Sequence, residues 1–285
     1  MTESAVTYIE STDGVIVALH ELGGDGPPLL FCHATGFCGP VWKPLADCLT
    51  DRFHCHALDF RAHGASTVPD TGHMQWSGMV DDFLAVTHLL SPSEPIRAVG
   101  HSLGGGIIVL AEARAPGTIR SAWTFEPILF PSPTPDETTD APHRSMMADT
   151  ARRRRRYFDR RDEVYERYRS RPPLDQLDDR CLRAYVDHGF RDRPDGTVEL
   201  ACSPENEARI FEQHRTGADV AAAELTVPMV VAVGGEEDPP VEAAVEVTKR
   251  NPRLQLLRYS DLTHFGPLEA PERIASDIGR WFSSV

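Results

Sequence analysis

Lysine is nearly absent from this chain, and so are the patterns in which cysteine usually builds a site. All but two of its 29 basic residues are arginine, and 43 acidic residues leave a formal net charge of −14. This acidic balance argues against nucleic acid or an anionic membrane surface as the main partner. The six cysteines form no CxxC pair and are too sparse for a disulfide scaffold. His54, Cys55 and His56 fall on an expected strand, where successive side chains point to opposite faces, so no metal site is expected there.

Long apolar runs are also missing. No stretch approaches the roughly 18 apolar residues that a membrane-spanning helix needs. The first residues, MTESAVTYIE, lack the basic start and apolar run of a signal peptide. We therefore expect a cytoplasmic protein that acts on a small molecule, with no nucleic-acid or membrane partner. The oligomeric state stays open, a homodimer included.

Short apolar runs alternate with helical patterns along much of the chain, which predicts a mostly parallel α/β sheet flanked by helices. Several of these are nearly continuous apolar runs, as expected for strands covered on both faces. The turn ELGGDGPP between the first two strands is interpreted as a hairpin connection. Strands are predicted at Val15–Leu22, Leu29–His33, Phe53–Asp59, Ile96–Gly100, Ala122–Glu126, Met229–Gly234 and Leu254–Tyr259. Helices are predicted at Val41–Leu49, Trp76–Leu90, Leu103–Ala115, Val241–Arg250 and Pro271–Phe282.

The alternation breaks at FPSPTPDETTDAP, residues 130–142, where four prolines indicate a linker. From about Ser145 to Phe211 the sequence is charged and helix-prone, without a convincing central strand. The strand pattern then resumes at VPMVVAVGG. We predict one sheet domain, residues 1–130 and 216–285, interrupted by a helical insertion over residues 131–215.

The octet VGHSLGGG, residues 99–106, joins an apolar run to an amphipathic helical pattern. This strand–turn–helix setting is where G-x-S-x-G indicates an exposed nucleophilic serine, here Ser102. Gly100 and Gly104 would remove side chains that clash around the sharp turn. Backbone N–H groups at the helix start, near Leu103, would face negative charge forming on a substrate. Alone, the motif is equally consistent with a glycine-rich turn that only permits tight packing.

A second loop, within LLFCHATGFCGPVW at residues 29–42, follows an expected strand. Thr35 is the best-placed residue there to supply another backbone N–H to an oxyanion hole. His33, at the strand end, is interpreted mainly as a hydrogen-bonding stabiliser of the loop and not as a general base.

Two further loops offer an acid and a base. Asp238 in VAVGGEEDPP follows a strand and is the preferred carboxylate to orient an imidazole. Glu236 and Glu237 compete for that role, and so does Glu126, at the end of the preceding strand in WTFEPIL. His264 in LTHFGPLE lies between the last strand and the last helix and is the best candidate base. His101 is adjacent to Ser102 in sequence and badly placed to face its hydroxyl.

Together these segments resemble the α/β-hydrolase superfamily, specifically members with a cap domain after the sixth strand. The resemblance covers nearly the whole chain and rests on HATGF, DFRAHGAS at residues 59–66, GHSLGG, GEEDPP and THFGPLE. Ala62 and Ala34 stand where many members have glycine, and the second change bears on the oxyanion geometry. The resemblance implies that the insertion is a helical cap.

It also implies a cofactor-free serine hydrolase of a small carboxylic ester, lactone or thioester, acting through an acyl-enzyme. Ser102 would be the nucleophile, His264 the base and Asp238 the acid, with Thr35 and Leu103 forming the oxyanion hole. A serine at this turn speaks against the dehalogenases and epoxide hydrolases of the fold, which use aspartate. Hydrolysis of a C–C bond in a diketone-like substrate, a perhydrolase activity and a non-catalytic ligand-binding role remain alternatives.

The insertion carries the run ARRRRRYFDRR, and residues 152–193 hold 14 arginines against nine acidic residues. We interpret this basic segment mainly as docking electrostatically on an acidic core. The alternative is that some of Arg152–Arg156 pair with an anionic substrate group. His33, Phe37, Tyr157 and Tyr185 are kept as candidates for substrate binding, because such pockets are largely aromatic and apolar.

Overall fold

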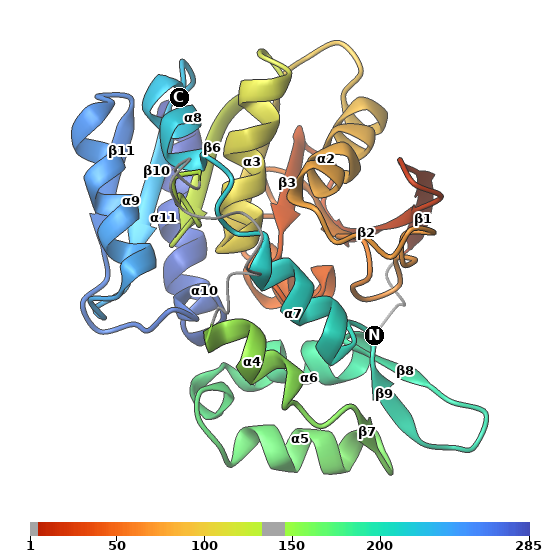
Figure 1. Cartoon of the computed structure of the whole chain (residues 1–285). Coiled ribbons are helices and arrows are strands. Elements are labelled where there is room, and N and C mark those ends of the chain that lie inside the picture. The colour runs from red at the N-terminus through yellow and green to blue at the C-terminus, as the bar shows by residue number, and fades with distance from the viewer. Residues whose placement is uncertain (1–4, 133–145) are drawn as a thin grey trace.

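A twisted sheet of eight strands organises the chain, with helices on both of its faces (Figure 1). The computed structural model describes residues 5–132 and 146–285. The strand order is β1-β2-β4-β3-β5-β6-β10-β11, and the pairings from β4 to β11 are all parallel. The strands are β1 (Val6–Glu10), β2 (Ile16–Gly23), β3 (Pro28–Cys32), β4 (His54–Asp59), β5 (Ile96–His101), β6 (Ile119–Phe125), β10 (Met229–Val233) and β11 (Leu254–Arg258).

The two faces of the sheet bury separate cores, because neighbouring residues of a strand point to opposite sides. Leu30 packs in the core beneath α2, α3, α8 and α9, whereas Phe31 belongs to the core beneath α1 and α11. Both side chains are fully buried. The helices that accompany the main sheet are η1 (Gly39–Trp42), α1 (Lys43–Ala46), α2 (Trp76–Leu90), α3 (Leu103–Arg114), α8 (Ala218–Glu224), α9 (Pro239–Arg250), α10 (Gly266–Glu269) and α11 (Pro271–Ser284).

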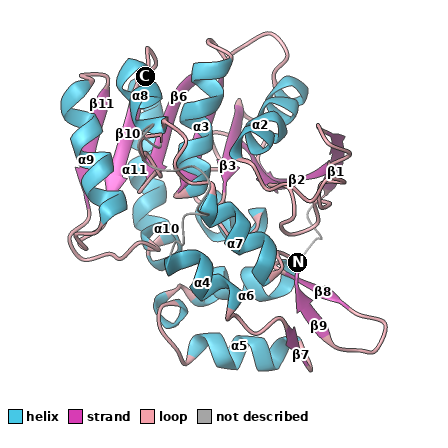
Figure 2. Ribbon diagram, viewed as in Figure 1, coloured by secondary structure: helices cyan, strands magenta, loops and turns pink. Residues whose placement is uncertain are grey.

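Residues 146–212, here called the intervening segment, lie at one end of the main sheet (Figure 2). Their aromatic side chains join the α1–α11 core, with Phe158 and Tyr185 each about 1% exposed. The segment contains α4 (Met146–Arg152), β7 (Tyr157–Phe158), α5 (Arg161–Arg169), η2 (Leu174–Gln176), α6 (Asp179–His188), β8 (Phe190–Asp192), β9 (Val198–Leu200) and α7 (Pro204–Glu212). The small β7-β9-β8 sheet was not expected from the sequence, and most of the proline-rich linker lies outside the described residues.

The predicted parallel α/β sheet is confirmed, but the predicted hairpin at ELGGDGPP is wrong. β2 and β3 are not neighbours, because β4 lies between them. The hairpin is instead formed by β1 and β2, whose ends are joined by the bond from Ser11 N to Val15 O at 2.8 Å. Strand β1 was missed because its side chains are largely exposed, so its sequence carries little apolar signal.

A buried carboxylate at the end of β4 connects strand β2, the start of η1 and the loop after β4. Asp59 accepts hydrogen bonds from Gly39 N at 2.6 Å, Ala65 N at 2.8 Å and His20 Nε2 at 2.8 Å. Burial alone would raise the pKa of Asp59, but the interaction with the hydrogen-bonded His20 and the bond from Gly39 N lower it to about 2. The carboxylate therefore stays charged at neutral pH and anchors the start of η1 to the core.

Two buried histidines hold the loop that follows β3. His63 accepts a hydrogen bond from Gly36 N at 3.0 Å and donates from Nδ1 to Arg61 O at 3.0 Å. His33 accepts from Phe60 N at 3.1 Å and donates from Nδ1 to Ala34 O at 2.8 Å. Both rings must be neutral to accept at Nε2. Burial lowers the pKa of His33 and lowers that of His63 to about 3.

A buried ion pair links the loop after β4 to α2. Arg61 donates from Nη2 and Nε to the two carboxylate oxygens of Asp82, at 2.7 and 2.9 Å. Ser11 Oγ donates to the same carboxylate at 2.6 Å. The side chains of Arg61 and Asp82 are 3% and 0% exposed.

None of the described helices is long and apolar enough to cross a membrane.

Replacing Asp82 should destabilise the fold strongly. The Asp82→Ala variant leaves the guanidinium of Arg61 buried without its partner, which costs about 3–5 kcal/mol of unfolding free energy. Urea denaturation followed by circular dichroism measures this loss. The matched control is Asp47→Ala, which breaks the exposed Lys43–Asp47 pair and should cost less than about 1 kcal/mol. Equal losses in the two variants would contradict this account of the buried pair.

Stability should fall as the pH drops from 7 to 5. Burial lowers the pKa of His63 to about 3 and that of His56 to about 4, so both stay neutral in the folded chain over this range. The unfolded chain binds protons at these histidines below about pH 6.5, so acid favours unfolding. Each such histidine lowers the free energy of unfolding by about 2 kcal/mol between pH 7 and pH 5.

The measurement is urea denaturation at several pH values. His63→Gln keeps an acceptor for Gly36 N but does not titrate. The change of unfolding free energy with pH should therefore become smaller by the contribution of one histidine. His73→Gln, at an exposed position, is the matched control. A parent protein with constant stability between pH 7 and pH 5 would show that these histidines do not drive unfolding.

Candidate active site

Ser102 occupies a sharp turn between β5 and α3. Its backbone is left-handed, with φ 52° and ψ −113°, and its residue surface is only 7% exposed. A Cβ on Gly100 would lie 2.6 Å from Gly105 N, and a Cβ on Gly104 would lie 2.3 Å from Cys32 O. The turn therefore requires glycine at both positions, and Gly104 brings the end of β3 against the start of α3.

The loop after β3 forms a tight turn next to this helix start. Phe37 N donates to Ala34 O at 3.1 Å, and Gly36 between them has φ 81°. The Gly36 N–H is turned toward His63, as described above. Within residues 5–132 and 146–285, the backbone N–H groups of Thr35 and Leu103 have no hydrogen-bond acceptor. Two unused N–H groups thus flank the meeting point of β3 and α3.

His264 lies in the loop between β11 and α10, and its partner is Glu126. The Nδ1 atom of His264 donates to Glu126 Oε2 in a short hydrogen bond. The other oxygen, Glu126 Oε1, accepts from Gly234 N at 2.8 Å. Glu126 is 1% exposed and has a left-handed backbone with φ 42°. This donation leaves Nε2 of His264 as the basic ring nitrogen.

Asp238 does not occupy the position predicted for it. Its Oδ1 accepts from Val241 N at 3.0 Å and caps the start of α9, where two prolines follow. Glu126, the alternative acid of the sequence analysis, takes its place beside His264. The physical reason is that GEEDPP begins a helix, so the backbone N–H groups there use the carboxylate of Asp238 as a cap.

His101 fixes the loop of His264 beside the serine turn. Its Nε2 donates to His264 O at 2.7 Å, and the two rings lie 4.9 Å apart between centroids. Burial and the nearby His264 lower the pKa of His101 well below its ordinary value. No hydrogen bond joins Ser102 Oγ to His264 among the described residues, so direct contact between nucleophile and base stays a prediction. Such contacts are often long in enzymes without substrate.

The candidate substrate-binding residues fall into two groups. Phe37 and Tyr185 pack with their ring centroids 4.7 Å apart and the rings tilted by 37° at the junction of the β3 loop and α6, and the Phe37 ring centroid also lies 5.9 Å from that of Phe265. His33 is fully buried with both ring nitrogens bonded to backbone, which fits loop stabilisation and not substrate contact. Tyr157 is 43% exposed and packs under arginine side chains, away from this junction.

The run Arg152–Arg156 pairs mainly within the intervening segment, so these arginines do not themselves dock on the acidic core. Arg152 pairs with Glu205 at 3.0 Å, and Arg155 pairs with Glu163 at 2.5 Å. Arg154 is different, because it pairs with Glu207 at 2.6 Å and lies against the β3 loop. The wider basic segment does link to the core: Arg180 of α6 pairs with Glu272 of α11, and Arg191 donates to Gly64 O and Ser66 O in the loop after β4.

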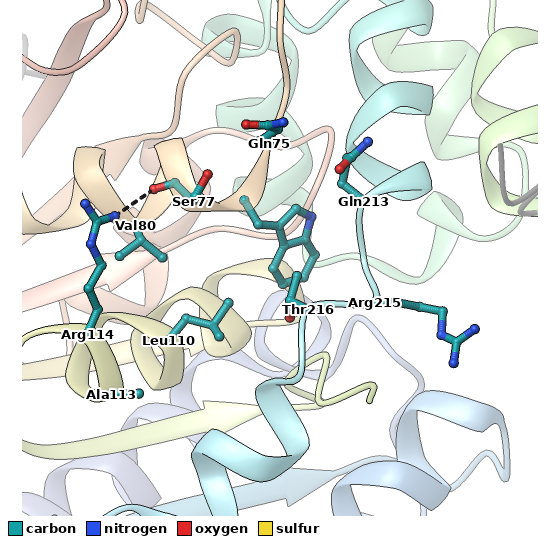
Figure 3. A pocket seen from close by; sticks show the side chains of 10 residues that line it. Gln75, Ser77, Val80, Leu110, Ala113, Arg114, Gln213, Arg215 and Thr216 are labelled. Carbon is teal, nitrogen blue, oxygen red and sulfur yellow. Dashed lines mark hydrogen bonds between the residues drawn. The ribbon is translucent and has the colours of Figure 1, made fainter. Parts of the chain in front are cut away.

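Two remaining features of the molecule concern metal binding and a surface groove. Among the described residues no group of three or more His, Cys, Asp or Glu could hold a metal ion. A surface groove of about 610 Å³ lies between α2, α3 and the residues after α7 (Figure 3). None of Ser102, Glu126 and His264 lines this groove, whose lining residues are Gln75, Trp76, Ser77, Val80, Leu110, Ala113, Arg114, Gln213, Arg215 and Thr216.

Comparison with known proteins agrees with this architecture. A 2-(acetamidomethylene)succinate hydrolase from Mesorhizobium japonicum is 39% identical over 98 residues, or 34% of this chain and 34% of that protein. The chain thus matches about a third of the length of this curated relative. A crystal structure of E-2-(acetamidomethylene)succinate hydrolase is similar with a TM-score of 0.80 at 22% identity, covering 98% of this chain and 99% of that one.

A thermophilic esterase from Thermogutta terrifontis, solved with malate bound, is similar with a TM-score of 0.73 at 21% identity, covering 98% of each chain. At these identities the two structures show the shared fold alone. The sequence profile described as "alpha/beta hydrolase fold" matches residues 27–271, most of the chain. The protein therefore belongs to the α/β-hydrolase fold family.

Proposed function

We propose that this protein is a serine hydrolase that cleaves a small-molecule carboxylic ester, lactone or thioester. Ser102 is the nucleophile, His264 the general base and Glu126 the carboxylate that orients the base. The observation that carries the proposal is the bond from His264 Nδ1 to the buried Glu126, beside a serine held in a left-handed turn. A carboxylate at Nδ1 keeps Nε2 basic and stabilises the imidazolium that forms during catalysis.

The chemistry proceeds in two steps. Ser102 Oγ attacks the carbonyl carbon while its proton passes to Nε2 of His264. The N–H groups of Thr35 and Leu103 donate to the oxyanion of the tetrahedral intermediate. The leaving group departs with the proton from His264, and an acyl-enzyme remains. Water, deprotonated by His264, then releases the acid and restores Ser102.

The relatives support hydrolysis as the reaction class. One similar structure is described as a hydrolase of an acetamidomethylene succinate and another as an esterase. In our proposal the intervening segment serves as a cap over the site, with its boundaries near residues 131 and 215. Its support is that the aromatic residues of α6 pack against Phe37 of the β3 loop.

Covalent labelling tests the nucleophile. A fluorophosphonate probe should modify the wild-type protein at Ser102, because an activated serine attacks phosphorus as it attacks a carbonyl. Ser102→Ala should abolish labelling and ester turnover, while circular dichroism shows an unchanged fold. Ser91→Ala, at the end of α2, should label like the wild type. Failure of the folded wild-type protein to label, or labelling that persists in Ser102→Ala, would refute the role of Ser102.

A pair of variants tests the acid. In Glu126→Gln the amide oxygen should bind Gly234 N–H, so the amide NH₂ faces His264 Nδ1 and imposes the wrong tautomer. We expect kcat to fall on the order of 10⁴-fold, as for the equivalent change in a serine protease triad. Asp238→Asn should keep activity within about twofold, because Asn caps a helix as well as Asp does.

Steady-state kinetics on a simple aryl ester, with the melting temperature of each variant, provides the measurement. A large loss of kcat in Asp238→Asn, with Glu126→Gln active, would return the role to Asp238. Folded variants that are both fully active would show that neither carboxylate orients the base.

A further inference from the structure

Arg154 has a more buried side chain than the other paired arginines of its run. Its side chain is 22% exposed, whereas those of Arg152, Arg155 and Arg156 are 36–44% exposed. Its Nη1 donates to Glu207 at 2.6 Å. Its Nη2 donates to two tyrosine hydroxyls, Tyr185 at 2.7 Å and Tyr168 at 3.3 Å. A single guanidinium therefore connects α5, α6 and α7.

This guanidinium lies on the loop that carries Thr35. A Cβ added to Gly36 would come within 3.1 Å of Arg154 Nη1 and 2.6 Å of Glu207 Oε1. Tyr185, bound to Arg154, packs against Phe37, and Phe37 packs against Phe265, the residue after His264. Arg154 thus lies against the loop that carries Thr35, and it is connected to the residue after His264 indirectly, through Tyr185 and Phe37.

The hydrogen-bonding capacity of this cluster is only partly used. Arginine has five N–H donors, and three of those of Arg154 are bonded. Its Nε–H and one Nη1–H have no acceptor within the described part of the chain. Tyr168 and Tyr185 accept from Arg154, so their own hydroxyl protons remain available to donate. Burial raises the pKa of Tyr185, which keeps its hydroxyl protonated.

The surroundings strengthen an interaction with an anion. The rings of Tyr168 and Tyr185, whose hydroxyls bind the guanidinium, stack 5.9 Å apart, and Phe190 packs against both rings. In such a low-dielectric environment, a charge-assisted hydrogen bond is stronger than in water. Planar guanidinium donors also match the geometry of a carboxylate.

We propose that Arg154, with the hydroxyls of Tyr168 and Tyr185, binds a carboxylate group of the substrate. This inference rests on the proposed function and narrows its substrate class to esters, lactones or thioesters of acids that carry a second carboxylate. The carboxylate is held on the intervening segment while the scissile carbonyl faces Ser102. Glu207 positions the guanidinium before substrate binds and competes with the substrate for its charge.

The experiment compares matched acid and amide substrates. The monomethyl esters of malonate, succinate, glutarate and adipate each carry a carboxylate, and the corresponding amides replace it with a neutral group of similar shape. Wild-type enzyme should prefer the acid of at least one chain length. Arg154→Gln should raise KM for that acid roughly 10- to 100-fold, as expected for loss of hydrogen bonds to a charged group. Turnover of the matching amide should change less than about threefold.

Two further variants separate recognition from a structural role. Glu207→Gln removes the internal counter-charge and should lower KM for the acid relative to the amide. Arg152→Gln, which breaks exposed ion pairs with Glu205 and Glu212, should leave the acid-to-amide ratio unchanged. Equal losses on acid and amide in Arg154→Gln, or no wild-type preference for any acid, would overturn the proposal. Fluorophosphonate labelling of Ser102 reports separately on the proposed function, because it needs neither substrate.

Discussion

The left-handed turn at Ser102 is the constraint on which the site depends. A non-glycine residue in this conformation costs roughly 1–2 kcal/mol, so the surrounding structure must hold it. Ser102 N donates to Phe125 O at 2.9 Å, and Ser102 O accepts from Gly106 N and Ile128 N at 3.1 and 3.2 Å. These bonds tie the turn to the end of β6, to the first turn of α3 and to the loop after β6. They place the serine hydroxyl beyond β5 and leave the first N–H groups of α3 facing the same side.

A second left-handed residue terminates the neighbouring strand. Glu126 directly follows β6, has φ 42° and donates its own N–H to Ala232 O at 2.8 Å. Adjacent parallel strands β5 and β6 thus each end in a strained polar residue whose side chain enters the proposed triad. Strain at such positions persists where the fold over-determines the backbone. Here the bond from Ser102 N to β6 and the bond from Glu126 N to β10 hold the two backbones in place. The carboxylate of Glu126 accepts the hydrogen bond from His264.

The parallel part of the sheet could be predicted because its central strands are covered on both faces. Strands β3 and β10 are therefore apolar throughout, and β5 is apolar except for Arg97 and His101, a pattern that single-sequence reasoning detects. Strand β1 escaped because its residues face solvent, and β7 to β9 are only two or three residues long. The hairpin error has a different cause. β2 and β3 are consecutive in the chain, but the pairing of β4 between them is a long-range contact that no local pattern encodes.

The choice of acid shows where such reasoning stops. Asp238 and Glu126 each follow a strand whose end lies at the same edge of the sheet, so strand position cannot separate them. What separates them is the use of each carboxylate by nearby backbone. The prolines after Asp238 start α9, and its carboxylate is bound to Val241 N, whereas Glu126 is buried and shared between Gly234 and His264. A carboxylate directly before two prolines therefore argues for a helix cap, and that sequence signal favours Glu126 as the partner of the base.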